Sequence, residues 1–412
     1  MKPLFVTWDG PGPNYLESLF MPILSAARRP GDELHVLQYA WEADERVASI
    51  RRAAQRLDVA YTSRPVWRTP PGPATTAMIV RGAVDVVRYA RRHRVNVLMP
   101  RSIIPAKMCL LALRLLRGVK LAYHTDGLMA DERVDFGGWN PDGRAYRALR
   151  SIEAAALRRA DVVLALTEQA KHLLAERSGD GTLPERCVVV SNGKDAEVFG
   201  VGSPASRAAM RDQLGLDLSA PMVVYAGSFD DEKYNASRVV AFFRSVLQLR
   251  ADAHLLILTG SPALAREMTD RASLPEESYT VRRVAPLDVP AYLAVGDVGL
   301  AFIEPALSMR AVAPIKVGEY LLCGLPVFAT SGVGDLDDQL DGSVGCLTDT
   351  LTDESLAEAA RWVVDDVLPD REAFRQRCRR RGLEQFSLER TVEQYSRAFR
   401  MLDGAPASED DR

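Results

Sequence analysis

The feature that most constrains the fold of this chain is an alternation of strand-like and helix-like segments that starts near the N-terminus. Short runs rich in Val, Ile and Leu alternate with longer segments whose apolar residues recur at helical spacing. Such alternation is typical of a parallel sheet covered by helices on both faces. For the first half we predict strands at Leu4–Trp8, Glu33–Tyr39, Val95–Met99, Lys120–Tyr123, Asp161–Leu166 and Cys187–Val190, and helices at Tyr15–Arg29, Glu42–Leu57, Ala77–His93 and Arg144–Ala160.

The same alternation begins again after Gly193–Ser206, a segment with several glycines that we interpret as a linker. A chain of 412 residues also exceeds what one hydrophobic core usually supports. We therefore predict an α/β fold of two doubly wound Rossmann-like domains, residues 1–200 and 201–385, which face each other across a cleft. The strands predicted for the second domain are Met222–Ala226, His254–Thr259, Tyr279–Val284, Val298–Ile303 and Val327–Ala329.

Composition indicates the environment of the protein. Hydrophobic residues at 47% and charged residues at 26% are ordinary for a soluble globular chain. The five cysteines are far apart and form no Cys-x-x-Cys pair, which argues against a metal cluster or disulfide framework and for a reducing compartment. The N-terminal residues lead directly into a strand, and no apolar run approaches the ~20 residues of a membrane-spanning helix. We expect a cytoplasmic protein.

Positive charge is concentrated between Arg64 and Lys120, where twelve basic residues stand against one acidic residue, Asp85. This segment carries +11 in a chain whose formal net charge is −3. So local an excess usually faces an anionic partner. An anionic membrane surface suits it, because residues 106–117 are apolar with basic residues interspersed, although burial of that helix against the sheet is the alternative. Nucleic acid is disfavoured, since no aromatic platform accompanies the charge.

The strongest site signal is Pro314-Ile-Lys316-Val-Gly-Glu319. If Pro314 and Ile315 open a helix, Lys316 and Glu319 lie on one face of its first turn. The N–H groups and the positive dipole end of a helix start suit a phosphate, Lys316 adds a charge, and Glu319 can accept hydrogen bonds from sugar hydroxyls. The pattern predicts a nucleotide-sugar site; a surface Lys–Glu pair on an ordinary helix is the alternative.

Two glycine turns of the second domain fit the same site. Gly227 ends a strand, which would let a diphosphate approach the backbone closely, and Lys233 follows at a suitable spacing. A solvated charged turn explains Lys233 equally well, so Lys316 is the stronger candidate for a phosphate ligand. Gly332-Val-Gly334-Asp335 follows another strand, where glycine N–H groups and one acceptor could line the diphosphate or the sugar.

Polar residues also follow two strands of the first domain, at the sheet edge where sites form in such folds. Arg101 follows one strand, and His124 and Asp126 follow the next. His124 could hydrogen-bond the transferred sugar or orient an acceptor, while a satisfied structural histidine is the alternative. Asp126 and Glu132, in the adjacent loop, are the candidate general-base or acceptor-binding carboxylates.

These motifs resemble those of retaining glycosyltransferases of the two-Rossmann-domain type, the group called family 4. In that family the donor helix reads roughly Pro-x-Lys-x-x-Glu-Tyr-Leu-x-x-Gly-x-Pro-Val. Residues 191–199 are similar to its Asn-Gly-x-Asp-x-x-x-Phe element between the domains, and residues 225–228 to its glycine turn. Residues 126–137 are similar to a loop of members that build bacterial surface polysaccharides. The resemblance covers about residues 1–402.

The resemblance implies a retaining hexosyltransferase of the glycosyltransferase B fold. Such an enzyme moves a sugar from a nucleoside diphosphate sugar to a hydroxyl of a glycan acceptor, here expected to be lipid-linked, in surface polysaccharide or glycoconjugate synthesis at the inner face of the cell membrane. No cofactor and no metal ion are expected. The Asp-x-Asp pattern at Asp335 and Asp337, which holds a divalent ion in a different glycosyltransferase fold, is therefore not predicted as a metal site.

The resemblance also implies that Gly10 and Gly12 form a glycine loop that faces the acceptor, and that a helix at 386–403 crosses back to the first domain. The polar residues 404–412 are expected to be a disordered tail.

Two positions depart from the family pattern. Ser228 stands where relatives often carry an arginine, and Ala311 stands where many carry the first of two glutamates. The resemblance therefore leaves the donor sugar unassigned. Two further functions stay open: a nucleotide-sugar 2-epimerase, which shares this architecture, and a catalytically silent partner subunit that binds a nucleotide sugar.

Overall fold

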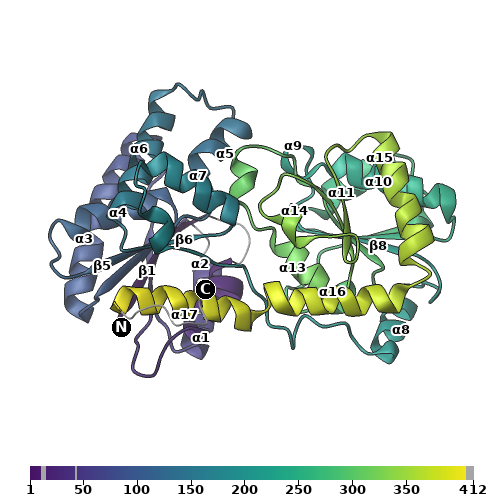
Figure 1. The fold of residues 1–412 in the computed structure, drawn as a ribbon, viewed down its shortest axis with the longest axis horizontal. Coiled ribbons are helices and arrows are strands. Elements are labelled where there is room, and N and C mark those ends of the chain that lie inside the picture. Colours follow the sequence, from purple (N-terminus) through teal and green to yellow (C-terminus); the bar gives the residue numbers. More distant parts are fainter. Residues whose placement is uncertain (11–14, 42–43, 405–412) are drawn as a thin grey trace. The chain divides into compact units, whose positions relative to one another are not determined.

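The computed structural model describes residues 1–10, 15–41 and 44–404. It divides into two compact units (Figure 1). Unit 1 comprises Met1–Ser191 and the chain from Thr391 onward, and unit 2 comprises Asn192–Arg390. The boundary expected at residue 200 therefore lies inside unit 2, and the expected tail, apart from Gly404, lies outside the described residues.

Unit 1 is built on a seven-stranded parallel sheet with the order β3-β2-β1-β4-β5-β6-β7. The central strands are buried on both faces, as β1 with its run Leu-Phe-Val illustrates, which is the pattern of a parallel sheet covered by helices. The chain order reverses between β1 and β4, which is where ligands bind in such sheets. The strands are β1 (Pro3–Asp9), β2 (His35–Ala40), β3 (Ala60–Pro65), β4 (Val97–Pro100), β5 (Lys120–His124), β6 (Val162–Ala165) and β7 (Cys187–Val189).

The helices of unit 1 follow the strands in alternation. Capping residues mark where these helices begin and end. The Thr167 hydroxyl accepts the N–H of Ala170 at the N-terminus of α7, and Arg94 ends the long helix α3 in the left-handed conformation. The helical segments are η1 (Leu16–Phe20), α1 (Met21–Ala26), α2 (Asp44–Arg56), α3 (Pro73–His93), α4 (Ile103–Leu113), α5 (Met129–Asp135), α6 (Arg144–Arg159), α7 (Glu168–Ser178) and η2 (Leu183–Arg186).

Unit 2 repeats this architecture with a six-stranded parallel sheet of order β10-β9-β8-β11-β12-β13. Its chain order reverses between β8 and β11. Five of the six strands coincide with predicted ones. The strands are β8 (Met222–Ala226), β9 (His254–Leu258), β10 (Tyr279–Arg282), β11 (Val298–Ala301), β12 (Val327–Thr330) and β13 (Gly345–Thr348).

The helices of unit 2 form two groups. Helices α11 and α15 pack on α10, whereas α12 and α16 pack on α13. The helical segments are α8 (Pro204–Gln213), α9 (Asp231–Tyr234), α10 (Ala236–Leu249), α11 (Pro262–Arg271), η3 (Glu276–Ser278), α12 (Val289–Leu293), η4 (Ser308–Ala311), α13 (Ile315–Leu322), α14 (Leu336–Gln339), α15 (Asp353–Arg361), η5 (Trp362–Val367) and α16 (Arg371–Phe386). They are followed by α17 (Leu388–Asp403), most of which belongs to unit 1.

The two sheets and their covering helices thus give the α/β fold of two Rossmann-like domains that the sequence predicts.

Helix α17 carries the chain from unit 2 back to unit 1. Its residues from Thr391 onward belong to unit 1, where the Tyr395 hydroxyl lies 3.0 Å from His124 Nε2. The side-chain oxygen of Gln394 accepts the N–H of Ser191 at 2.8 Å, and Arg29 pairs with Asp403 at 2.5 Å. The last helix is therefore part of the unit 1 core.

Close glycine contacts fix helix α13, which carries the Lys316 motif. A Cβ on Gly382 of α16 would lie 2.7 Å from the Leu322 nitrogen, so the two helices can meet only because a side chain is absent there. At the sheet, the Tyr320 hydroxyl accepts the N–H of Ala226 at 2.8 Å and donates to Leu300 O at 3.3 Å. Helix α13 is thereby tied to β8 and β11, the two strands between which the chain order reverses.

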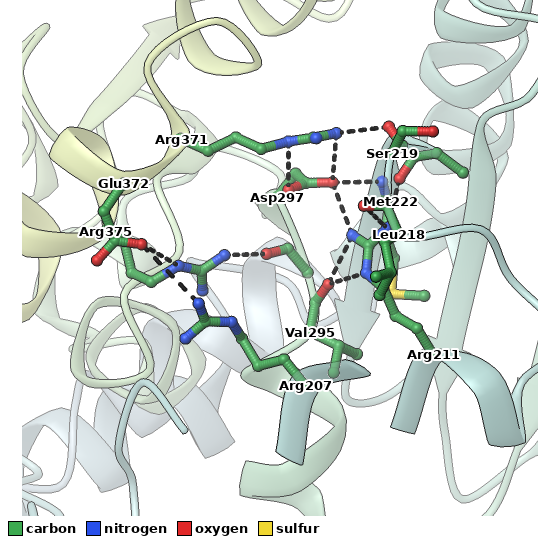
Figure 2. Close-up of polar contacts among 12 residues, drawn as sticks. Arg207, Arg211, Leu218, Ser219, Met222, Val295, Asp297, Arg371, Glu372 and Arg375 are labelled. Carbon is green, nitrogen blue, oxygen red and sulfur yellow. Dashed lines mark hydrogen bonds and ion pairs between the residues drawn. The ribbon is translucent and has the colours of Figure 1, made fainter. Parts of the chain in front are cut away.

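A buried ion network lies at the amino-terminal ends of the central strands β8 and β11 (Figure 2). The Asp297 carboxylate accepts hydrogen bonds from Arg211 Nη2 at 3.0 Å and from the Met222 N–H at 2.8 Å, and pairs with Arg371 Nε at 3.0 Å. Arg211 donates further to Val295 O. The network joins α8 and α16 to the sheet, away from the strand ends where ligands bind.

The basic segment is only partly exposed. Helix α4 is largely buried, so the expectation that residues 106–117 face a membrane is wrong for most of that helix, and burial against the sheet is what the structure has. Arg101 lies in a polar cluster inside unit 1, and Lys120 donates to Leu402 O. Across the part of the chain that the structure describes, no helix has the length and apolar character needed to cross a bilayer.

Candidate functional site

The site in unit 2 begins where β8 ends. Gly227 follows this strand with a φ of +136°, a conformation that L side chains rarely adopt. A Cβ at this position would lie 3.1 Å from Lys316 Nζ and 3.3 Å from its Cε. Glycine is therefore needed both for the backbone conformation and for the close approach of the lysine, which brings two predicted donor-binding residues together.

Lys316 presents a buried ammonium group. Its Nζ is buried and has no hydrogen-bond partner among the residues that the structure describes. The Tyr225 ring centroid lies 4.2 Å from Nζ and the Tyr234 ring centroid 5.1 Å, so the cation is met by aromatic faces. Burial lowers the pKa of Lys316 to about 7, although Glu319 and Asp230 act to raise it. Such a group would gain a partner from a bound anion.

Glu319 does not pair with Lys316, its neighbour on the same helix. Its Oε1 lies 3.0 Å from Nζ of Lys194, and both side chains are mostly buried. Lys194 belongs to the Asn-Gly-Lys-Asp segment, and its neighbour Asn192 donates to Ala313 O at 3.1 Å, just before α13. The alternative of a surface Lys316–Glu319 pair is therefore wrong, because Glu319 has a different cationic partner.

Lys233 and Lys316 both approach the ring of Tyr234. The Lys233 Nζ is 5.8 Å from the centroid of the Tyr234 ring, the same ring that Lys316 approaches. Asp230 begins the short helix α9 by accepting the N–H of Lys233 at 3.1 Å. Ser228, in the position where relatives carry arginine, is exposed and its carbonyl accepts the Tyr225 hydroxyl. The β8–α9 turn thus brings a second lysine to the region of Lys316.

The glycine turn after β12 differs from the expectation. The Gly332 N–H donates to Asp337 Oδ2 at 2.8 Å, and the Gly334 N–H donates to Met309 O at 2.9 Å. Both amides already have acceptors within the protein, so in this structure neither is available to a diphosphate. Asp335 stands at the start of α14. The Asp337 carboxylate of the Asp-x-Asp pattern stabilises this turn by accepting the Gly332 N–H.

In unit 1, the residues after β1, β4 and β5 form one polar cluster. Arg101 pairs through Nη1 with Asp9 Oδ1 at 3.1 Å and through Nη2 with Asp126 Oδ2 at 2.8 Å. Its guanidinium lies 4.4 Å from the centroid of the Phe20 ring. Burial raises the pKa of Asp126, while Arg101 opposes that rise. The sequence analysis predicts that Arg101 and Asp126 lie at the same edge of the sheet, and in the structure the two side chains form an ion pair.

His124 is placed differently from the expectation. It is 0% exposed, its Nε2 lies 3.0 Å from the Tyr395 hydroxyl, and the Phe20 ring packs against it edge-on. Burial lowers its pKa to about 3, so the imidazole is neutral. A direct contact of His124 with a substrate is not possible in this structure, because Tyr395 and Phe20 cover the ring. The histidine is buried, as the structural alternative expects, but its Nδ1 has no hydrogen-bond partner among the described residues.

The remaining unit 1 candidates are less enclosed. Glu132 lies in helix α5 and not in the loop that the sequence analysis expects, and it is partly exposed. Gly10 packs on Trp41, whose ring atom Cζ2 would lie 2.3 Å from an added Cβ, so it has a packing role. Gly12 lies outside the described residues.

A buried carboxylate that the sequence analysis missed is Asp131, next to Glu132. Arg177 binds it with both Nη atoms, at 2.8 and 3.0 Å, and the Tyr146 hydroxyl donates to it at 3.0 Å. Nearby, burial raises the pKa of Glu153 to about 7, against the effect of Arg150. This cluster joins α5, α6 and α7. No sequence signal marks it, because its members lie on three separate helices.

Unit 2 also has a polar cavity whose lining does not include Lys316. Within residues 1–10, 15–41 and 44–404, no group of three or more His, Cys, Asp or Glu side chains is placed to hold a metal ion. A polar cavity of about 270 Å³ lies at the ends of β11, β12 and β13 in unit 2. It is lined by Asn235, Arg238, Glu304, Pro305, Thr330, Asp349, Thr350 and Leu351.

Comparison with known families agrees with this geometry. The model of the family described as Glycosyltransferase Family 4 matches residues 22–198, and the model described as Glycosyl transferases group 1 matches residues 220–366. The first match lies in unit 1 except for residues 192–198, which belong to unit 2, and the second match lies within unit 2. The two models together follow the two Rossmann-like units along the chain.

Individual proteins are similar in sequence or in fold. The chain is 27% identical to alpha-maltose-1-phosphate synthase of Mycolicibacterium smegmatis over 281 residues, which are 63% of this chain and 68% of that protein. A glycosyltransferase of Rickettsia africae superposes with a TM-score of 0.73 at 14% identity, over 98% of this chain and 100% of that one. The Anabaena protein HepE, solved in complex with UDP-glucose, superposes with a TM-score of 0.70 at 17% identity, over 98% and 100%.

The two sheets, the Lys316 site at the reversal point of the second sheet and the two family matches lead to one assignment. The chain belongs to the family 4 group of glycosyltransferases with the two-Rossmann-domain fold, which use nucleotide sugars as donors.

Proposed function

We propose that this protein is a retaining hexosyltransferase that moves a sugar from a nucleoside diphosphate sugar to a hydroxyl of a lipid-linked glycan in surface polysaccharide or glycoconjugate synthesis. The proposed donor site rests on one observation, the Lys316 ammonium. This group is buried and has no hydrogen-bond partner among the described residues. It lies 3.1 Å from the position that a Cβ on Gly227 would take. A diphosphate placed beside Gly227 would supply the missing counter-charge.

In this proposal catalysis comes mainly from stabilising the departing diphosphate. The bond between the sugar C1 and the phosphate oxygen breaks, and a bond from C1 to the acceptor oxygen forms on the same face of the sugar. Lys316 and the N-terminus of α13 stabilise the charge that develops on the phosphate, and Lys233 adds a second cation from the β8–α9 turn. Glu319 would accept hydrogen bonds from sugar hydroxyls of the donor.

The acceptor proton passes to the departing phosphate oxygen, so the reaction needs no protein base. This fits the unit 1 cluster, in which His124 is covered and Asp126 is paired with Arg101. We propose that Arg101, Asp126 and Glu132 bind hydroxyl groups of the acceptor. No cofactor or metal ion takes part in this scheme.

The outer face of α3 is the best candidate for a membrane-docking surface. On this helix Val80 and Val84 are 56% and 42% exposed, and Arg88 and Arg91 follow on the same side. Arg91 also donates to the carbonyl of Leu115, whose side chain is 63% exposed. Exposed apolar side chains among arginines suit an anionic leaflet at the cytoplasmic side, where a lipid-linked acceptor would be collected.

A panel of nucleotide sugars tests the proposed reaction. The protein is incubated with each donor and a lipid-linked glycan, and NMR of the product reports the anomeric configuration. Transfer with retention at C1 supports the proposal. Formation of an epimeric nucleotide sugar would instead indicate the 2-epimerase, and binding without turnover the silent subunit.

A further inference from the structure

Lys316 and Glu319 have the sequence spacing at which a lysine and a glutamate on one helix usually meet. Side chains three residues apart on α13 lie on one face, and their opposite charges attract. A closed Lys316–Glu319 pair would neutralise the cation that a phosphate needs. The structure avoids this, because Glu319 pairs with Lys194 at 3.0 Å and the Lys316 Nζ keeps no polar partner among the described residues.

The backbone of Lys194 is held on both sides, which fixes where its side chain starts. The Lys194 N–H donates to Phe386 O at 2.9 Å, and its carbonyl accepts the N–H of Leu388 at 2.8 Å. Two residues earlier, Asn192 Nδ2 donates to Ala313 O at 3.1 Å. The segment is therefore anchored to the end of α16 and to the residue that precedes Pro314 and α13.

The Lys194 ammonium is also placed by its surroundings. Its Nζ lies 5.5 Å from the centroid of the Phe199 ring, and its side chain is 14% exposed, against 16% for Glu319. An ion pair that is mostly shielded from water is held more firmly than a surface pair. In the structure this contact sets the direction of the Glu319 carboxylate.

We infer that Lys194 is a positioning residue of the donor site: it holds the Glu319 carboxylate away from Lys316 and so leaves the Lys316 ammonium open to a phosphate. The phosphate part of this inference rests on the proposed function, whereas the arrangement of the three side chains does not. The same contact keeps the Glu319 carboxylate in one place, ready to accept hydrogen bonds from the donor.

The groups that face Lys316 define what removal of Lys194 should do. They are Glu319 on its own helix, Asp230 before α9, and the rings of Tyr225 and Tyr234. In Lys194→Met, Glu319 loses its partner and closes on Lys316. The titration midpoint of Lys316 should then rise by about one pH unit or more, because a nearby carboxylate favours the charged lysine.

NMR of the ligand-free protein measures this midpoint. The lysines are Lys2, Lys107, Lys120, Lys171, Lys194, Lys233 and Lys316, so ε-carbon labelling of lysine gives few signals, and the signal absent from Lys316→Met identifies Lys316. Lys194→Arg, which keeps the charge, should leave the midpoint unchanged. Lys171→Met, which removes the Lys171–Glu168 pair in unit 1, is the matched control and should also leave it unchanged.

A double variant separates the carboxylate from the charge of Lys194 itself. In Lys194→Met/Glu319→Gln the midpoint should return to the wild-type value or below it. An unchanged midpoint in Lys194→Met, or a rise that persists in the double variant, would overturn the inference. Lys194→Gln replaces the methionine variant if that one does not fold.

Calorimetry with UDP, GDP and ADP adds the functional readout. At pH 7, Lys194→Met should bind the preferred nucleotide about tenfold more weakly than wild type, and Lys194→Arg should bind it nearly as well. Equal binding by wild type and Lys194→Met would contradict the inference. If the wild type binds none of the three nucleotides, the proposed donor site is wrong, and the NMR titration still decides the role of Lys194.

Discussion

The Tyr320 hydroxyl accepts the N–H of Ala226 at 2.8 Å, so the helix that carries Lys316 is fixed to the strand that ends at Gly227. This bond is buried, and it sets the distance between a glycine turn and a lysine that lie far apart in the sequence. The precision of the proposed phosphate site therefore depends on the packing beneath it.

Replacing Lys316 tests the site directly. Lys316→Met keeps most of the length of the side chain and removes its charge, so transfer should fall by more than about 10-fold through lost stabilisation of the departing phosphate. Because the ammonium is buried and without a hydrogen-bond partner among the described residues, its removal should not lower the melting temperature. Steady-state kinetics and thermal unfolding measure the two effects. Normal kinetics in a folded variant would exclude Lys316 from the site.

The affinity for a nucleoside diphosphate should depend on pH through Lys316. Its pKa is about 7 without ligand, and a bound phosphate favours the charged form, so the pKa is higher in the complex. Between the two values binding takes up a proton, and affinity should fall as pH rises above about 7. Calorimetry in buffers of different ionisation enthalpy measures the proton uptake. The proton uptake that begins above about pH 7 should be absent in Lys316→Met.

Gly227→Ala should damage the site without damaging the sheet. The new Cβ would lie 3.1 Å from Lys316 Nζ at a φ of +136°, so both the lysine and the backbone would have to shift. We expect the affinity for the nucleoside diphosphate to fall by about tenfold. Gly260→Ala is the matched control, since nothing lies within 4 Å of its added Cβ. Equal loss of affinity in both variants would indicate a general effect on the unit.

The sequence predicts most of the framework, and its failures occur at sheet edges. The central strands appear close to their predicted bounds, because a strand buried on both faces reads as a continuous apolar run. Strands β3 and β13 were missed. Both lie at an edge, and β3, with the polar sequence Ala-Tyr-Thr-Ser-Arg-Pro, is half-exposed along its length. An edge strand has one neighbour and little need for apolar residues.

Only those site residues that have a recognisable spacing in the sequence could be predicted. The spacing predicts that Lys316 and Glu319 share a helix face, but the partner of Glu319 comes from a segment more than a hundred residues earlier. His124 follows a strand as predicted, yet Tyr395 from the last helix covers it. Partners from distant segments depend on tertiary packing, and no local pattern carries that information.

Asp297→Asn should destabilise unit 2. The Asp297 side chain is 2% exposed and is paired with Arg211 and Arg371, so its loss leaves two guanidinium groups without their carboxylate. Breaking such a buried pair costs about 3–5 kcal/mol. Chemical denaturation measures the change. Asp353→Asn, which affects an ion pair whose carboxylate is 87% exposed, should change little. Similar stability of both variants would contradict the structural role of Asp297.

The α3 surface should bind anionic vesicles in a salt-dependent way. Each basic residue near such a surface contributes about 1 kcal/mol, so Arg88→Gln/Arg91→Gln should lower co-sedimentation with anionic liposomes at low salt. Arg244→Gln/Arg271→Gln, which changes two exposed arginines of unit 2, is the control. Equal recovery on neutral and anionic vesicles, or no loss at high salt, would return these arginines to an ordinary solvated face.

The return of α17 to unit 1 has a consequence for how the chain is synthesised. Residues 192–390 form unit 2 as one uninterrupted stretch, whereas unit 1 lacks Tyr395 over His124 and the contact of Lys120 with Leu402 until the last helix leaves the ribosome. Domains usually fold in their order of synthesis. Here the N-terminal unit is the last to be completed, so its unfinished core must wait while a whole second domain is made.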